Sequence, residues 1–459
     1  MGEKTVKTEQ NKMGYAKMFP LIMSMSLPAI FSMTVMALYN IVDSIFVGRL
    51  SDGVYALEAT SYAYPLQMLM ISFAVGTAVG VNSLISRRLG AGNQKEADLA
   101  ATHGILLAIF TWILFVVVGL FAVKPFLSLY GCKDTVYNYG VEYLTIVLCF
   151  SGFSMVQVSI EKSLQATGDM IFPMLFQLAG AITNIIFDPL LIYGIGPFPE
   201  LRVRGAAIAT VFGQLVGMIF AVVTLFVHKN KVHVTFKNFR LNIETVKNIY
   251  AVGFPSIIMQ SISSFMIIGF NAILSAYQSA VTVLGIYFKL QSFVFMPCFG
   301  LNQGVLPIMG FNYGARNKKR LYSAMKYGVL IALVIMIVGT AVFMMIPDKL
   351  LALFNDDPNL VSVGVPAFRT ICLCFIPAAL GIIFISLFQA TGKGIRALII
   401  SFTRQLVFIL PVAFILSRFF PLDTVWLAFP IAEGMSLILA ILLFLQLAKT
   451  DFKKLDNKG

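Results

Sequence analysis

Leu164-Gln165-Ala166-Thr167-Gly168 returns 224 positions later as Phe388-Gln389-Ala390-Thr391-Gly392. The same shift of 224 superimposes further blocks from the two halves of the chain. It pairs Gly76 with Gly300, Gly80-Val81 with Gly304-Val305, Gly90-Ala91-Gly92-Asn93 with Gly314-Ala315-Arg316-Asn317, Leu127-Ser128-Leu129 with Leu351-Ala352-Leu353, and Gly140-Val141 with Gly364-Val365. One register holding over so many blocks indicates an internal duplication, so we expect two halves with the same fold.

The composition is that of an integral membrane protein. Of 459 residues, 58% are hydrophobic and 12% are charged, and the mean hydropathy is +0.86. A water-soluble fold cannot bury so much apolar surface. Apolar stretches long enough to cross about 30 Å of hydrocarbon recur along the chain. We predict twelve spans, at 19–47, 54–83, 97–123, 138–161, 170–193, 205–228, 244–274, 281–309, 322–346, 363–388, 395–418 and 424–448.

The predicted fold is therefore an all-α membrane protein with twelve transmembrane helices in two six-helix lobes. Because each half has an even number of spans, both halves enter from the same side, and the repeat is parallel. The polar stretch His228–Arg240 interrupts the apolar pattern between them. The predicted organisation is a cytoplasmic tail at 1–18, an N-lobe at 19–228, a cytoplasmic linker at 229–243, a C-lobe at 244–448 and a second cytoplasmic tail at 449–459.

The net charge of +13 is distributed unevenly across the predicted membrane. Counted from an inside N-terminus, 24 of the 34 Lys and Arg residues, Lys162 among them, fall in the predicted cytoplasmic segments. This asymmetry follows the positive-inside rule, so we expect a multi-pass protein of the cell (inner or plasma) membrane with both termini in the cytoplasm. The partner is then the lipid bilayer rather than nucleic acid, and we expect a monomer.

An acidic residue, Asp43, is predicted at membrane depth late in the first span. Ionisable groups are costly there and usually have a function. Tyr39 and Asn40 precede Asp43 by one helical turn, so the three side chains share a face. The alternative interpretation is a hydrated carboxylate near the outer interface.

A second acid, Asp188, is predicted in the fifth span. Asn184 lies one turn before it, and Pro189 leaves the carbonyl of Ile185 without its helical donor. Two carboxylates with amide neighbours suit proton exchange or an oxygen-ligated cation. Asp188 could instead mark an outer helix end.

The second half lacks these acids. In the repeat, Asp43 aligns with Phe270 or Asn271, and Asp188 aligns with Pro411 or Val412. The deep charges of this half are Lys289, Arg404 and Glu433. Glu433 would line the cavity or form a salt bridge, and the two basic residues would snorkel or pair with an acid.

The chain carries 22 Met and 41 Phe residues, which suit a deformable, apolar binding cavity. We predict no cofactor, no metal centre and no enzymatic activity, because the sequence has neither a nucleotide-binding glycine loop nor metal-ligand spacing nor a reactive cluster. Transport would then be driven by an ion gradient. The candidate substrate-cavity residues are Met33, Met36, Tyr39, Asn40, Gln67, Asn271, Gln303 and Glu433.

The chain resembles the multidrug and toxic compound extrusion (MATE) family over about residues 15–450. The resemblance rests on the six-plus-six spans, on the Gln-Ala-Thr-Gly of both halves, and on Tyr39-Asn40-Ile41-Val42-Asp43 and Gly90-Ala91-Gly92-Asn93. It implies the MATE/MOP fold and a rocker-switch cycle that exports lipophilic organic cations, such as drugs or dyes, against inward H+ or Na+. It also implies an N-lobe site for the coupling cation at Asp43, Tyr143, Asn184 and Asp188, with Thr210 a weaker match; Na+ would bind at Asp43, Asn184 and Asp188.

One departure from the family pattern concerns the second half. NorM-type members carry acids in the seventh and tenth spans, whereas the matching stretches here, Ser261-Ile262-Ser263-Ser264 and Pro377-Ala378-Ala379-Leu380, carry none. The chain therefore looks closer to the DinF-type bacterial branch, with coupling through the first half. The alternative function is a lipid-linked oligosaccharide flippase of the same superfamily, which would hold an anionic headgroup with Arg404 or Lys289.

Overall fold

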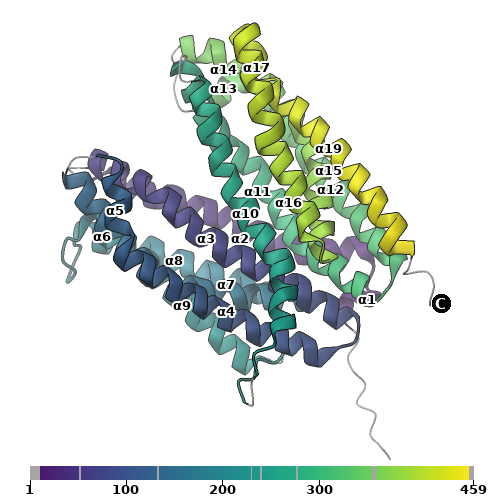
Figure 1. Ribbon diagram of the computed structural model, residues 1–459. Helices are drawn as coiled ribbons and strands as arrows, with labels where there is room; N and C mark the ends of the chain where they lie inside the picture. Colours follow the sequence, from purple (N-terminus) through teal and green to yellow (C-terminus); the bar gives the residue numbers. More distant parts are fainter. Residues whose placement is uncertain are drawn as a thin grey trace, which may run out of the picture.

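The computed structural model describes residues 11–50, 53–131, 134–228, 230–237, 240–274, 278–353 and 358–453. These residues form helices and their connections, with no strand among them, and Figure 1 shows the helices gathered into two bundles. The N-lobe contains α1 (Lys12–Tyr15), α2 (Met18–Gly48), α3 (Gly53–Gly90), α4 (Gln94–Phe121), α5 (Val123–Ser128), α6 (Asp134–Cys149), α7 (Gly152–Thr167), α8 (Ile171–Tyr193) and α9 (Arg202–Val227).

The C-lobe repeats this order of helices. It contains α10 (Ile243–Leu274), α11 (Gln278–Gly314), α12 (Lys318–Met345), α13 (Pro347–Ala352), α14 (Pro358–Ile371), α15 (Phe375–Ala390), α16 (Gly394–Phe402), α17 (Leu410–Phe419), α18 (Leu422–Val425) and α19 (Ala428–Leu447). A π-helical stretch, Thr403–Ile409, joins α16 to α17, and another, Ala448–Phe452, extends α19. The prediction of an all-α protein with two repeated lobes is confirmed.

The predicted twelve spans correspond to eleven long apolar helical segments and one bent pair, counted over the described residues. The bent pair is α6 and α7, which meet at 44° where we predicted a single span, 138–161. At the break, a Cβ atom on Gly152 would lie 2.2 Å from the Trp112 ring, so the chain passes directly over that indole. Trp112 Nε1 donates to the carbonyl of Cys149 at 2.7 Å, which satisfies a carbonyl at the interrupted helix end.

Sequence blocks that are equivalent in the repeat form equivalent structures. Asn93 caps α4 by accepting a hydrogen bond from the backbone N of Glu96 at 3.3 Å, and Asn317 caps α12 by accepting one from Arg320 N at 3.1 Å. The two Gln-Ala-Thr-Gly motifs end α7 and α15, and their glycines, Gly168 and Gly392, have φ of 94° and 80°. The duplication read from the sequence is thus a duplication of local structure.

The lobes touch through glycines that the repeat relates. A Cβ atom on Gly76 would lie 2.7 Å from the backbone N of Ile257, and one on Gly300 would lie 2.7 Å from the backbone N of Ile30. One turn further on, a Cβ on Gly80 would lie 2.2 Å from the carbonyl oxygen of Ile249. Small residues let membrane helices approach to backbone contact. α3 therefore packs on α10 as α11 packs on α2, and the interface is symmetric.

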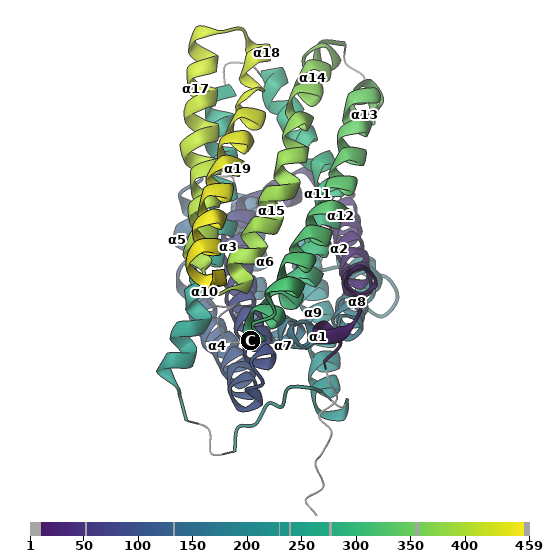
Figure 2. The same cartoon turned by 90° about the vertical axis from the view of Figure 1, so that its right-hand side faces the viewer.

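The two bundles meet at one end and diverge at the other (Figure 1). α1 and the last turns of α19 lie at the closed end, as the view turned by 90° also shows (Figure 2). At the opposite end, α5 and α6 of the N-lobe point away from α13, α14 and α17 of the C-lobe. The symmetric glycine contacts hold the lobes together where α3 meets α10 and where α11 meets α2.

Candidate functional site

The two predicted acids meet inside the N-lobe. α2 carries Asp43 and α8 carries Asp188, and their carboxyl groups lie close enough to interact with each other. Asp188 is fully buried, and Oδ1 of Asp43 is buried without a hydrogen-bond partner among the described residues. Two negative charges in contact inside a protein repel strongly, so this geometry is favourable with a proton or a cation between the carboxyl groups.

Neutral polar groups surround the pair. With the Asn184 amide oriented to satisfy both of its neighbours, Nδ2 donates to Asp188 Oδ2 at 3.1 Å and Oδ1 accepts from the backbone N of Thr210 at 3.2 Å. The structure thus brings together all five residues expected at the coupling-cation site. Among the described residues no group of three or more His, Cys, Asp and Glu side chains is arranged to hold a metal. Two carboxylates with amide and hydroxyl oxygens suit H+ or Na+.

Two tyrosines complete the acid cluster. Tyr39 and Tyr143 lie close enough to both carboxyl groups to interact with them electrostatically, and Tyr143 contacts the side chain of Gln67. Tyr143 is only 6% exposed, so its phenol faces the cluster rather than water. A buried phenol donates to a carboxylate or ligates a cation.

A cavity of about 140 Å³ opens from the acid cluster into the N-lobe. Asn184 and Thr210 lie at its acid end, and the predicted substrate residues Met36 and Tyr39 form part of its wall. It is lined by Ser32, Met36 and Tyr39 of α2, by Ser154, Gln157, Val158 and Glu161 of α7, by Gln177, Gly180, Ala181 and Asn184 of α8, and by Thr210, Gly213 and Gln214 of α9. The cavity is therefore enclosed by four helices of one lobe.

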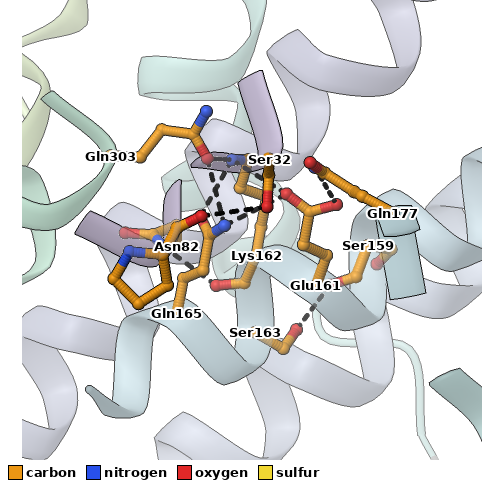
Figure 3. Close-up of polar contacts among 10 residues, drawn as sticks. Ser32, Asn82, Ser159, Glu161, Lys162, Ser163, Gln165, Gln177 and Gln303 are labelled. Carbon is orange, nitrogen blue, oxygen red and sulfur yellow. Dashed lines mark hydrogen bonds and ion pairs between the residues drawn. The ribbon is translucent and has the colours of Figure 1, made fainter. Parts of the chain in front are cut away.

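A third carboxylate, Glu161, lies elsewhere on the wall of the same cavity (Figure 3). Its Oε2 accepts a hydrogen bond from Gln177 at 3.0 Å, and its Oε1 accepts one from Gln165 at 3.0 Å. Glu161 is 2% exposed. Glu161 is not among the predicted site residues, although Glu161 and Gln165 are spaced by one helical turn immediately before the Gly168 helix end.

Lys162 does not lie in a cytoplasmic segment as predicted; that assignment is wrong. Its side chain is buried in α7, with Nζ 3.3 Å from Glu161 Oε1. Nζ also donates to Gln165 Oε1 at 2.8 Å and to Gln303 Oε1 at 2.7 Å (Figure 3). Gln303 belongs to α11, so this predicted cavity residue joins the N-lobe network to the C-lobe. The sequence signal was the adjacent pair of opposite charges, which neutralise each other and can be buried together.

Other predicted cavity residues lie elsewhere. Met33 and Asn271 are half-buried and do not line the 140 Å³ cavity. The side chain of Asn40 lies outside the described residues. In the C-lobe, Glu433 is buried and pairs with Arg404, whose Nη1 is 3.2 Å from Glu433 Oε1. This ion pair is the salt bridge that the sequence analysis left open.

Comparison with known proteins supports the fold and the duplication together. The MatE family model matches residues 28–190 and 255–415, once in each half. The multidrug export protein MepA of Staphylococcus aureus (strain bovine RF122 / ET3-1) is 26% identical over 426 residues, covering 93% of this chain and 93% of that protein. The FAD transporter of Shewanella oneidensis is 26% identical over 423 residues, covering 90% and 91%.

A solved structure extends the likeness to three dimensions. It is described as the outward-facing conformation of a multidrug resistance MATE family transporter of the MOP superfamily. It superimposes with a TM-score of 0.90 at 26% identity, covering 97% of this chain and 99% of that one. The closer relation to the DinF-type branch stays a prediction. Because the family model matches both halves and the solved relative shares the fold over nearly the whole length, this chain belongs to the MatE family of membrane transporters.

Proposed function

We propose that this transporter exports lipophilic organic cations in exchange for H+ or Na+ that enters through the Asp43–Asp188 pair. The observation that carries the proposal is the proximity of these two carboxyl groups, since Asp43 has a buried oxygen with no hydrogen-bond partner in the described part of the chain. Such a pair gains most from a bound proton or cation. Membership of a family with multidrug exporters, MepA among the relatives, supports drug export as the overall function.

The cavity walls support a cationic cargo. Glu161 lies on the wall, and Asn184 on the wall contacts Asp188 of the acid cluster, while Met36 and Tyr39 provide apolar and aromatic surface. A lipophilic cation gains from both kinds of contact, since aromatic faces attract positive charge. Cargo and coupling ion would compete for the same negative field, which yields exchange without a separate coupling device. The compact cavity would have to widen for a drug-sized cation, as the divergent lobes allow.

The lobes would move as a rocker switch. The closed end carries α1, the end of α19 and basic residues such as Arg87, Arg88 and Arg316, so by the positive-inside rule it would face the cytoplasm. The structure then corresponds to the outward-open state, in agreement with the outward-facing solved relative. In the inward-open state the symmetric glycine contacts would separate. Spin labels at Val54 and Phe419, which are both exposed at the diverging end, should approach each other when the state changes.

The decisive experiment measures ethidium transport by purified protein in liposomes. A pH gradient and a sodium gradient are imposed in separate preparations, each with and without an ionophore that dissipates it. Transport that follows one of the two gradients and stops with its ionophore supports the proposal and identifies the ion. Transport that is indifferent to both gradients contradicts it.

The flippase alternative requires a basic group that faces a cavity and holds a phosphate. Arg404 already has a carboxylate partner in Glu433, so its charge is neutralised within the C-lobe. The described lining of the 140 Å³ cavity contains no Lys or Arg, its one carboxylate, Glu161, is paired with Lys162, and its Asn184 end adjoins the acid cluster, so the cavity offers a phosphate no basic partner on its wall. The observations therefore favour cationic cargo. Rescue of a cell-envelope glycan defect, without any gain in ethidium tolerance of an efflux-deficient bacterium, would favour the flippase.

A further inference from the structure

A second pocket lies at the closed end of the molecule, between the two lobes. Its volume is about 510 Å³. Arg87 and Arg88 enter it from the end of α3, Tyr313 from the end of α11, Arg316 from the turn after α11, Lys393 from the turn after α15, and Asp451 from the extension of α19. Both lobes therefore contribute cationic side chains to one concave site, which is separate from the acid cavity.

Positive charge exceeds negative charge in this pocket. Arg88 Nε pairs with Glu96 at 2.7 Å, and Lys393 Nζ pairs with Asp451 at 3.1 Å. Neither Arg87 nor Arg316 has a carboxylate partner among the described residues. Two guanidinium groups, one from each lobe, therefore face a shared space whose one carboxylate among the described lining residues, Asp451, is already paired with Lys393.

The Arg87 guanidinium is held in place by contacts other than an ion pair. Its Nε donates to the carbonyl of Ser83 at 3.0 Å. Its Nη1 packs so closely on the Gly392 turn that a Cβ atom at Gly392 would lie 2.5 Å away. The guanidinium is thus fixed at the seam between the lobes. A fixed, planar donor group of this kind matches the oxygen atoms of a phosphate.

Arg316 occupies a backbone conformation that disfavours any residue except glycine. Its φ is 55°, and its equivalent in the first half, Gly92, has φ of 73°. The second half therefore has an arginine where the first half has the conformationally suitable residue, although the left-handed region costs energy for an L-residue. Strain of this kind persists where a side chain has a role. Arg316 is exposed and lines the pocket.

We propose that this pocket binds a phosphate group that bridges Arg87 of the N-lobe and Arg316 of the C-lobe. Two kinds of molecule could supply this phosphate group: an anionic phospholipid, through its headgroup, or a soluble phosphate ester. Basic pockets between helices at a cytoplasmic membrane face bind anionic headgroups. Since both lobes supply the ligands, the phosphate binds the closed end in preference to the separated one and stabilises the conformation seen here.

The test compares thermal unfolding of the purified full-length protein in neutral detergent with three additives. These are phosphatidylglycerol, phosphatidylcholine and glycerol phosphate. The variant Arg316→Gly restores the residue of the first half and relieves the backbone strain, so it should fold. Lys319→Ala is the control, because it removes one exposed positive charge three residues away without touching the pocket.

We expect phosphatidylglycerol to raise the unfolding temperature of the wild type by several degrees and phosphatidylcholine to have no such effect. Arg316→Gly should weaken the apparent affinity about ten-fold, as expected for one lost charge-assisted contact, while Lys319→Ala should not. An equal shift with glycerol phosphate supports the site and assigns it to soluble phosphates; a shift with the lipid alone assigns it to lipid. Equal affinities in wild type and Arg316→Gly, or equal shifts with both lipids, would overturn the proposal.

A conformational measurement separates this site from the acid cavity. Spin labels at Val54 and Phe419 report the distance between the lobes at their diverging end in nanodiscs. Replacing phosphatidylcholine by phosphatidylglycerol should increase the long-distance population in the wild type. The increase should be as large in Asp43→Asn, which keeps the phosphate pocket, and smaller in Arg316→Gly. No change with lipid in any of these proteins would contradict the bridging role.

Discussion

The two lobes have the same helices in the same order, yet their interiors differ. Asp43 of the N-lobe belongs to a cluster of ionisable groups, whereas Phe270, one of the two C-lobe residues that align with Asp43, is completely buried. The Phe270 ring centroid lies 4.9 Å from that of Phe429 and 6.3 Å from that of Trp426. One lobe therefore keeps an ionisable interior, and the other has an aromatic core in the corresponding place.

This difference indicates that the two lobes have different roles in the duplicated fold. Aromatic side chains at Tyr287, Phe343, Phe368 and Phe375 continue the C-lobe core, with ring centroids 5.3 to 6.5 Å apart. Such packing resists deformation, so the C-lobe is suited to move as one body. In the proposed mechanism, a proton or cation would bind in the N-lobe, which has the cavity and the acids. Duplication preserved the backbone and its contacts, while the Asp43–Asp188 cluster belongs to the N-lobe.

The largest effect should come from removing the N-lobe acids. We expect Asp43→Asn and Asp188→Asn each to abolish gradient-driven ethidium efflux from liposomes, because an amide keeps the shape but carries no negative charge and takes up no proton near neutral pH. Asn271→Ala, a change beside the C-lobe equivalent of Asp43, should leave efflux within about two-fold of wild type, as expected away from a functional site. Near-normal coupled efflux by both acid variants would contradict the assignment of the coupling-ion site to Asp43 and Asp188. Complete loss of efflux in Asn271→Ala would indicate that the ion site lies in the C-lobe.

The next largest effect on efflux is expected from substituting the interface glycines, and it should be similar for the two lobes. Gly80→Ala would place a methyl group 2.2 Å from the Ile249 carbonyl oxygen, and Gly304→Ala would place one 2.9 Å from the backbone N of Ser26. Both changes should hinder closure at the α1 end and reduce efflux several-fold, to a similar extent.

Gly434→Ala is the matched control for this pair of substitutions. No atom lies within 4 Å of a Cβ placed on Gly434, so the added methyl group meets open space, and alanine is the better helix former. Efflux by Gly434→Ala should equal that of the wild type. If Gly80→Ala were harmful and Gly304→Ala harmless, the interface would not work as a symmetric hinge.

A smaller effect on transport, with a larger one on stability, is expected at Phe270. Phe270→Ala should lower the stability of the C-lobe by about 3–5 kcal/mol through the cavity it leaves. Efflux per folded molecule should stay gradient-dependent. Phe265→Ala, on the same helix but 62% exposed, is the control and should unfold like the wild type. Loss of coupling in Phe270→Ala at unchanged thermal stability would show that the C-lobe core takes part in ion exchange.

Much of this architecture could be predicted from the sequence, because the responsible patterns are local. Span lengths, the two Gln-Ala-Thr-Gly helix ends and the glycines of the repeat all follow from hydropathy and register. Polar neighbours one turn away single out Asp43 and Asp188 on their own helices, but that the two acids share one cluster was implied by the family resemblance and not by spacing. The bend at Gly152 was missed, because its cause is the Trp112 ring, which approaches from another helix.

The Glu161–Lys162 network shows the limit of reading charges one at a time. A lysine at the end of an apolar run resembles an anchor at the cytoplasmic surface, and Lys162 was assigned accordingly. Its burial depends on three partners, Glu161, Gln165 and Gln303, and the last of these comes from the other lobe. Only the folded arrangement supplies that partner. For the same reason the sequence could not decide whether Glu433 lines the cavity or forms a salt bridge, since its partner Arg404 lies on another helix.

The smallest effect on transport is expected from neutralising the buried ion pair of the C-lobe. Removing one partner, as in Arg404→Met or Glu433→Gln, leaves an uncompensated buried charge, so each single variant should be less stable by roughly 3–5 kcal/mol. Replacing both should recover most of that stability, because a buried ion pair and an uncharged pair of similar volume differ little. If the pair is structural, the double variant should also export ethidium within about two-fold of wild type and respond to the same gradient. A double variant that is stable but uncoupled would show that the C-lobe has an ion-responsive charge of its own, and the contrast between the lobes would be one of degree.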